Sequence, residues 1–451
     1  NFLGITFSDV KTIFTGIGIS IFITAVYFYF FHLFRHIKDL WNDKLLFYFF
    51  GISGFLIFLV FSLFFYPIIT HIFPSLEVLA NIKALALLSL IILILGFFAN
   101  PNIISLHRFY RMRLKDTFLE GNDFYLHEFL DKKIPYPLIN TTLNISGDKR
   151  LAGKKSFDFF LLSPLFCGSK LTKYVQTKES YYGKMHVSTA ITISGAAINP
   201  MMGIYTNRIL SFLITLLNVR LGYWADNPLF YKKNNFLARL ARLLSNDDIV
   251  FWPYYNLMSM FGKATLDRLK INLSDGGHIE NLGAFELLRR ECGLVLVVDA
   301  GVDKDYQFED FKNFVLRATN ELGVEISFDE DEKLEKVIKP SPSEAFSKRN
   351  FAVGKIKYKN GKEGILVYVK TSLTRDAFSE EEKIKGKSKK PTYLDYKRYH
   401  PDFPHESTLD QSFDPLQWEA YEMLGEDIAK RFLHEIENNP KYEKIKNLLF
   451  K

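Results

Sequence analysis

The chain divides into a first part that is almost continuously apolar and a longer second part in which short apolar runs alternate with charged residues. Three long uncharged stretches lie before residue 100, at about 13–34, 45–69 and 84–99. Each is close to the length that a helix needs to cross a hydrocarbon core of about 30 Å. Because these stretches lack a polar face, a buried core helix fits them less well. The pattern predicts a transmembrane helical region over 1–104 and a water-soluble domain over 105–451.

Basic residues between these stretches predict an orientation. Arg35, Lys38 and Lys44 follow the first stretch, and four more cations follow the third, at Arg108, Arg111, Arg113 and Lys115. Loops rich in Lys and Arg stay on the cytoplasmic side of a membrane. We therefore expect a multi-pass membrane protein whose water-soluble domain faces the cytoplasm.

In the second part, short apolar runs alternate with helical segments, which is typical of an α/β domain. One such unit can be delimited residue by residue. Residues 270–273 alternate like the end of a strand, and 274–277 form a Gly-rich turn. After the turn, 281–290 place apolar residues on one helical face, and 294–298 form an uninterrupted apolar strand. In α/β sheets the active site lies beyond the carboxyl ends of strands. A second pair of strands, 351–358 and 364–370, is predicted to form a hairpin around Asn360 and Gly361.

The Gly-rich turn holds the best candidate for chemistry. Asp275 would lie on a loop whose glycines, Gly276 and Gly277, allow unusual backbone torsions and close substrate approach. We predict Asp275 as a catalytic base and Ser274, Gly276 and Gly277 as its active-site loop. The alternative is structural, since Asp-Gly is common in ordinary turns and Asp275 could cap the following helix.

This segment and several others resemble the patatin-like and cytosolic phospholipase A families. Residues 274–290 read Ser-Asp-Gly-Gly-His-Ile-Glu-Asn-Leu-Gly-Ala-Phe-Glu-Leu-Leu-Arg-Arg, which is similar to the aspartate-bearing motif of those families. Further similar segments follow the order of the bacterial membrane-attached members, at 135–144, 159–169, 190–203, 218–222 and 402–411. Several separated motifs in the right order are more specific than one Asp-Gly-Gly. The resemblance covers about residues 108–429 and implies a patatin-like α/β fold on the bacterial inner membrane.

The resemblance implies a Ser/Asp dyad, in which a serine attacks an acyl ester carbonyl and the aspartate takes its proton. Only Asp275 has a counterpart here, because the sequence contains no Gly-x-Ser-x-Gly elbow. Ser53, Ser169 and Ser194 have neighbouring glycines but not the elbow, and none is assigned as nucleophile. We expect the nucleophile half-domain upstream of Asn1, in the same chain or in a separate one.

The expected function is therefore that of a membrane-bound, serine-type lipid acyl hydrolase of the phospholipase A or lysophospholipase type, with membrane lipids as substrate. The alternative is a catalytically inactive, membrane-anchored scaffold or partner subunit with a patatin-like fold. Nothing in the sequence indicates an organic cofactor or a metal: Cys167 and Cys292 have no partners at metal-binding spacing and are expected to be free thiols.

The chain has a formal charge of +7, but its basic residues lack the aromatic platform or reader motif of a nucleic-acid-binding protein. Nucleic acid is therefore not expected as a partner. Attraction to anionic lipid head groups explains the charge better, and a merely solvated basic surface is the alternative.

Overall fold

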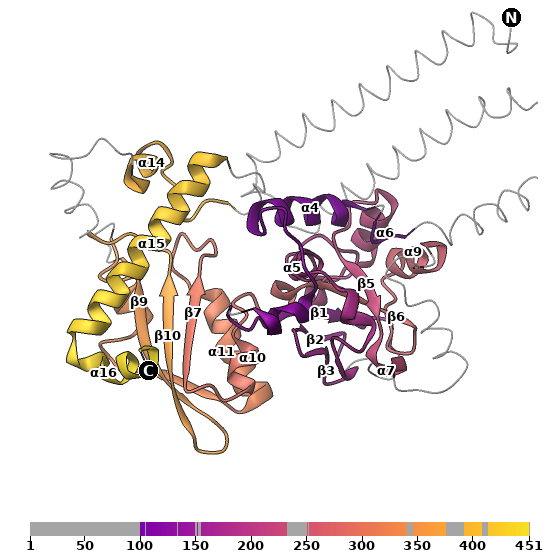
Figure 1. Cartoon of the computed structure of the whole chain (residues 1–451). Coiled ribbons are helices and arrows are strands. Elements are labelled where there is room, and N and C mark those ends of the chain that lie inside the picture. The colour runs from indigo at the N-terminus through magenta and orange to yellow at the C-terminus, as the bar shows by residue number, and fades with distance from the viewer. Residues whose placement is uncertain are drawn as a thin grey trace, which may run out of the picture. The chain divides into compact units, whose positions relative to one another are not determined.

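The computed structural model is drawn in Figure 1. It describes residues 100–103, 105–132, 134–148, 151, 155–231, 250, 252–340, 346–375, 392–407 and 414–450.

The chain forms two compact units that meet in sequence between His278 and Ile279. The segment 105–451, predicted as one domain, is therefore divided between them. Each unit has its own sheet and its own apolar core.

The first unit contains a six-stranded sheet in the order β4-β3-β2-β1-β6-β5. All neighbouring strands pair antiparallel. The strands are β1 (Ile139–Asn144), β2 (Phe157–Leu162), β3 (Phe166–Ser169), β4 (Lys173–Gln176), β5 (Tyr223–Asp226) and β6 (Lys270–Asp275). The helices are α4 (Leu106–Phe118), α5 (Val187–Ser194), α6 (Arg208–Leu216), α7 (Pro228–Tyr231) and α9 (Trp252–Met260), with short 3₁₀ turns η2 (Leu126–Asp131), η3 (Tyr181–Lys184), η4 (Gly203–Tyr205) and η5 (Gly276–His278).

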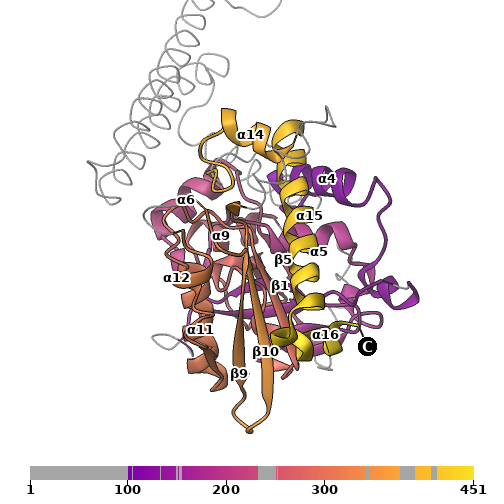
Figure 2. The same ribbon diagram turned by 90° about the vertical axis from the view of Figure 1, so that its left-hand side faces the viewer.

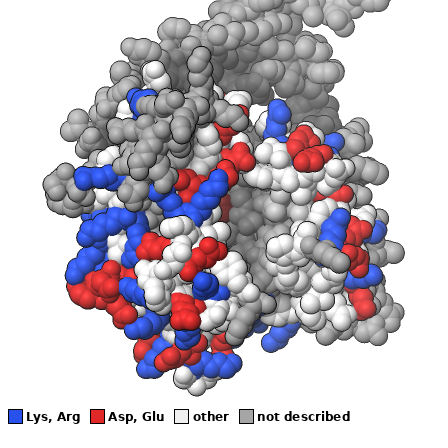
Figure 3. Space-filling view, turned by 60° about the vertical axis from the view of Figure 1, so that its left-hand side comes forward, with Lys and Arg blue, Asp and Glu red and all other residues white. Residues whose placement is uncertain are grey.

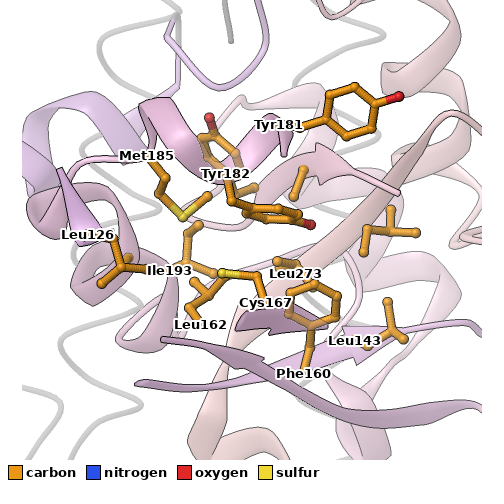
Figure 4. Packing of buried hydrophobic residues seen from close by; sticks show 14 of the residues in the cluster. Leu126, Leu143, Phe160, Leu162, Cys167, Tyr181, Tyr182, Met185, Ile193 and Leu273 are labelled. Carbon is orange, nitrogen blue, oxygen red and sulfur yellow. The ribbon is translucent and has the colours of Figure 1, made fainter. Parts of the chain in front are cut away.

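One face of this sheet packs against the main core of the first unit, part of which is shown in Figure 4. Leu143 of β1 and Leu273 of β6 are fully buried there, together with Ile193 of α5. Because successive strand residues point to opposite faces, the neighbours of Leu273 point to the other face. That alternation leaves Ser274 and Asp275 on different sides of the sheet.

The second unit has three layers. Its four-stranded sheet runs β7-β10-β9-β8, with β7 and β10 parallel and the other pairs antiparallel. The view in Figure 2 shows α11 and α15 on opposite sides of β9 and β10, and two separate apolar clusters fill the two interfaces. The strands are β7 (Leu294–Asp299), β8 (Glu325–Phe328), β9 (Phe351–Lys357) and β10 (Glu363–Lys370), and the helices are α10 (Phe285–Arg289), α11 (Glu309–Leu322), α12 (Leu334–Val337), α14 (Tyr393–Tyr399), α15 (Pro415–Asn438), η6 (Pro440–Tyr442) and α16 (Glu443–Leu449).

The predicted fold class, a patatin-like α/β domain behind a bundle of transmembrane helices, is contradicted, and so is the predicted multi-pass inner-membrane localisation. Within the described ranges no helix combines the length and the apolar character that crossing a bilayer requires. The longest of these helices, α15, has 24 residues but carries acidic and basic side chains along its length. The predicted spans at 13–34, 45–69 and 84–99 lie outside the described residues.

The predicted hairpin around Asn360 and Gly361 is confirmed, since β9 and β10 pair antiparallel on either side of it. The predicted strand–turn–helix–strand unit does not form in one sheet. Its first strand, β6, lies between β1 and β5, whereas β7 pairs with β10 in the other unit. The strand β7 also exposes alternate residues, because Leu296 and Val298 are exposed while Val295 and Val297 are buried.

Charged side chains of both signs share the surface. In the view of Figure 3, Lys and Arg are interspersed with Asp and Glu. Exposed pairs such as Lys355–Asp329 and Lys357–Glu325 contribute to this mixture. Such a mixture is typical of a solvated surface rather than of a single basic face.

Candidate functional site

Asp275 is the last residue of β6 and lies opposite Thr141 of β1. Its backbone is fixed on both sides. Its N–H donates to the carbonyl of Ala196 at 3.4 Å, and its carbonyl accepts from the Thr142 hydroxyl at 2.7 Å. The sheet and the segment after α5 therefore fix the backbone of Asp275 independently of any contact of its side chain.

The Asp275 carboxylate has one hydrogen-bond donor within the described part of the chain. Its Oδ1 accepts from the Gly277 N–H at 2.7 Å. The side chain follows Ile271 and Leu273 on the face of the sheet that packs on the core, and burial disfavours its charged form. Burial raises the pKa of Asp275 to about 6, and the Gly277 N–H opposes this shift. The group is thus a carboxylate poised to exchange a proton near neutral pH.

The structural alternative for Asp275, an ordinary Asp-Gly turn, explains the bond from its carboxylate to the Gly277 N–H. A bond from an aspartate oxygen to the N–H two residues later is the usual Asp-Gly turn. The side chain does not cap α10, which begins only at Phe285. A turn needs one oxygen, so the second carboxylate oxygen is left for other chemistry.

Gly276 is required for a different reason from the one predicted. Neither Gly276 nor Gly277 is among the glycines with positive φ, whereas Gly283 of the same motif is, with φ of +67°. A Cβ at position 276 would lie 2.7 Å from the Asn140 carbonyl oxygen. The glycine therefore allows β1 and the turn after β6 to approach closely.

Tyr110 of α4 is a neighbour of Asp275 that the sequence analysis missed. Burial raises the pKa of Tyr110, and the negative charge of Asp275 raises it further. A Cβ at Gly195 would lie 2.7 Å from the Tyr110 hydroxyl oxygen. The C-terminal end of α5 and the middle of α4 thus place a phenol within electrostatic reach of the carboxylate.

Ser274 points to the opposite face of the sheet and is fully buried. Its hydroxyl oxygen accepts from Asn144 Nδ2 at 2.9 Å and lies 2.9 Å from His278 Nδ1. His278 Nε2 lies 3.0 Å from the Ala197 carbonyl oxygen, so Nε2 carries the hydrogen and Nδ1 accepts from Ser274. Burial lowers the pKa of His278 to about 4, which keeps the ring neutral. This network fixes the loop and makes Ser274 a positioning residue.

Segments 135–144 and 190–203, which carry part of the family resemblance, contact this loop, and segment 218–222 contacts 190–203. Ala196 and Ala197, from the small-residue segment 190–203, hold Asp275 and His278 through their carbonyls. Gly203 N–H donates to Asn144 Oδ1 at 2.9 Å. The segment 218–222 joins them, because Leu221 N–H donates to the Ile198 carbonyl.

Two of the three serines considered as near misses have hydrogen-bond partners other than the carboxylate. Ser194 donates to the Asn140 carbonyl at 2.7 Å. Ser169 is buried in the β3–β4 hairpin and bonds to Thr172 at 3.0 Å. Ser53 lies outside the described residues. Within the described ranges, no serine hydroxyl hydrogen-bonds to Asp275.

Asn140 is a second residue that the sequence analysis missed. It is 8% exposed, and its Oδ1 has no hydrogen-bond partner among the described residues. Its Cβ lies 3.6 Å from the position of a Cβ built on Gly276. It lies in the segment 135–144 that carries part of the resemblance, but its place beside the loop follows only from the pairing of β1 with β6.

The described residues around Asp275 include no set of side chains suited to bind a metal ion. Across the described ranges, no group of three or more His, Cys, Asp or Glu side chains is arranged to hold a metal ion. Cys167 and Cys292 are both free, as predicted. Burial raises the pKa of the Cys167 thiol to about 11, so it is a poor nucleophile or ligand.

Comparison of the chain with protein-family models, with curated proteins and with solved structures gave no match in any of the three.

Proposed function

We propose that this chain carries the aspartate half of a serine-type acyl ester hydrolase that acts on lipids, with Asp275 as the proton acceptor. The observation that carries the proposal is the state of the Asp275 carboxylate. It ends a strand, has a single backbone N–H donor, and has its pKa raised by burial to about 6. A general base works best when its pKa lies near the working pH.

The packing of the loop supports the same proposal. Segments that resemble the patatin-like families at 135–144 and 190–203 both contact Asp275 and the loop after it. They are distant in sequence and meet at one loop in space, which is the arrangement that a common role at the loop requires. The segment 402–411 belongs to the second unit.

In the proposed reaction a serine hydroxyl attacks the acyl carbonyl while its proton passes to Asp275. The serine–carbonyl bond forms, the leaving alcohol departs with the proton returned by Asp275, and water then releases the fatty acid by the same route. The nucleophilic serine has to come from a segment other than the described residues. The neutral Tyr110 hydroxyl lies within electrostatic reach of the aspartate and is suited to donate a hydrogen bond to it.

The test is Asp275→Asn in the natural full-length protein. Fatty acid release from lysophosphatidylcholine should fall by about 10²- to 10⁴-fold, the usual contribution of a general base. Labelling by a fluorophosphonate probe should fall with it. The wild-type rate should rise with pH through about 6 and then level off, because the base acts only when deprotonated.

The matched control is Asp267→Asn, which changes an exposed aspartate of the same unit. It should leave both readouts unchanged. Undiminished labelling of the Asp275→Asn protein would refute Asp275 as the base. A wild-type protein that neither hydrolyses esters nor reacts with the probe would favour a catalytically inactive scaffold.

A further inference from the structure

A second feature of the first unit is the outer side of two of its helices, α6 and α9, which pack side by side. Large apolar side chains on and just after these helices are 40–67% exposed, namely Ile209, Phe212, Leu216, Leu217, Leu257 and Phe261. We call these residues the outer face. Single exposed apolar residues are ordinary, but a group of them on two adjacent helices marks an interaction site.

The polarity of α6 is inverted relative to an ordinary surface helix. Ser211 and Thr215 are buried, and the Ser211 hydroxyl bonds to the Pro200 carbonyl on the protein side. The residue after each of them, Phe212 and Leu216, is exposed. A surface helix normally turns its apolar residues to the core and its polar residues to water. The outer side of α6 is therefore adapted to apolar surroundings.

The segments that build the outer face carry positive charge only. Residues 180–225 and 249–266 contain no Asp or Glu. Arg208 begins α6 and Lys263 follows α9, and both are exposed. Neither side chain forms an ion pair with a described residue, and Lys263 Nζ lies 5.8 Å from the centre of the Phe261 ring. This uncompensated positive charge beside the outer face favours an anionic partner.

Helix α4, which Figures 1 and 2 show along the same edge of the first unit as α6, repeats the combination. Its exposed apolar side chains are spaced three residues apart, at Leu106, Phe109 and Met112. Arg108 and Arg113 lie among them, are exposed, and form no ion pair with a described residue. Arg113 Cζ lies 5.3 Å from the centre of the Phe109 ring. The one acidic residue of this helix, Asp116, is close to its C-terminal end.

A lipid surface matches these features better than a second copy of the chain. Exposed apolar side chains bordered by Arg and Lys enter the boundary between acyl chains and head groups, where the cations meet lipid phosphates. Two copies that met through this face would bring the same cations together, because a two-fold interface uses the same patch of both subunits. The apolar content and the charge together favour an anionic bilayer.

We propose that the outer face and the exposed side of α4 bind the surface of a bilayer that contains anionic phospholipid. Phe212 and Leu216 enter the acyl boundary, and Arg208, Lys263 and Arg113 bind head-group phosphates. This is contact with the surface of a bilayer, not a span across it. The proposal does not depend on the role of Asp275, because a protein without hydrolase activity would make the same contact.

The test attaches the fluorophore nitrobenzoxadiazole to the full chain in a Cys292→Ser background, where the remaining Cys167 is buried. One protein carries it at Phe212→Cys and a second at Leu216→Cys. The matched control is Leu165→Cys, an exposed leucine just before β3, and β3 lies at the other end of this unit in Figure 1. Vesicles of phosphatidylcholine and phosphatidylglycerol that contain a nitroxide-labelled lipid should quench both labels on α6 and leave the label at 165 unchanged.

Two charge variants separate this face from general electrostatic attraction. Arg208→Gln should raise the lipid concentration for half-maximal quenching of the label at 216 about fivefold, the usual contribution of one cation near an anionic surface. Lys170→Gln removes an equal charge from an exposed residue just after β3 and should have no effect. Thermal melts of each protein will confirm that the fold is kept.

The proposal is overturned if the labels at 212 and 216 are quenched no more than the label at 165, or if Arg208→Gln and Lys170→Gln act alike. A blue shift of the labels on α6 that grows with protein concentration in the absence of lipid, without quenching by the vesicles, would also overturn it and would indicate a second copy of the chain on this face. Quenching confined to α6 and strengthened by phosphatidylglycerol is the result that the proposal requires.

Discussion

Each unit has a strand that ends at an aspartate, and the two aspartates have opposite surroundings. Asp275 ends β6 and Asp299 ends β7, and in each case Oδ1 accepts from the N–H two residues later, at 2.7 Å from Gly277 and 2.8 Å from Gly301. The turn is therefore the same. The chemistry open to the two carboxylates differs, because only one of them has side-chain partners.

Asp299 is fully engaged. Its Oδ1 lies 2.9 Å from Lys370 Nζ and its Oδ2 accepts from the Tyr368 hydroxyl at 2.5 Å. Lys370 is 1% exposed and also donates to the Gly301 carbonyl. A buried carboxylate with a cation and a phenol is a structural group. Asp275 has no such partners among the described residues, and a partly buried carboxylate without them is the one available for proton transfer.

The largest expected effect is at Asp299. Asp299→Asn keeps the turn oxygen but leaves the buried Lys370 ammonium without its counter-charge. The free energy of unfolding should fall by about 3–5 kcal/mol, the usual cost of breaking a buried ion pair. Urea denaturation at pH 7.5 measures it. A loss below about 1 kcal/mol would mean that Lys370 finds another partner or stays exposed to water.

The same substitution at Asp275 should have the opposite sign. The folded-state pKa of Asp275 is raised to about 6, above its unfolded value, so ionisation weakens the fold as the pH rises from about 4 to above 6. Asp275→Asn removes that penalty and should raise the free energy of unfolding at pH 7.5 by about 3 kcal/mol at most. At pH 4 the two proteins should be equally stable. A variant that is less stable than wild type at pH 7.5 would show that Asp275 is a structural group like Asp299.

Local chemistry made some features predictable. The hairpin β9–β10 follows from Asn360-Gly361 between two apolar runs, because that turn fixes its own register. The Asp-Gly-Gly segment likewise identified a turn, which the bond from the Gly277 N–H to Asp275 Oδ1 closes. These signals need only a few adjacent residues.

Pairing between distant strands was not predictable in the same way. The sequence suggested that β6 and β7 share a sheet, yet β6 pairs with β1 and β5, and β7 pairs with β10. Strand partners are chosen by packing over long separations, which a single sequence does not display. Tyr110 and Asn140 were missed for this reason, since only the fold brings Tyr110 near Asp275 and Asn140 beside Gly276. The predicted spans lie outside the described residues, and none of the described helices is both long and apolar enough to cross a bilayer.

The most direct measurement is the titration of the Asp275 carboxyl by ¹³C NMR of aspartate-labelled protein, with the signal assigned by its loss in Asp275→Asn. A midpoint near pH 6 is expected, because burial without a cation favours the neutral acid. A midpoint near 4, the value of an ordinary solvated aspartate, would contradict the claim that this carboxylate is tuned to accept a proton.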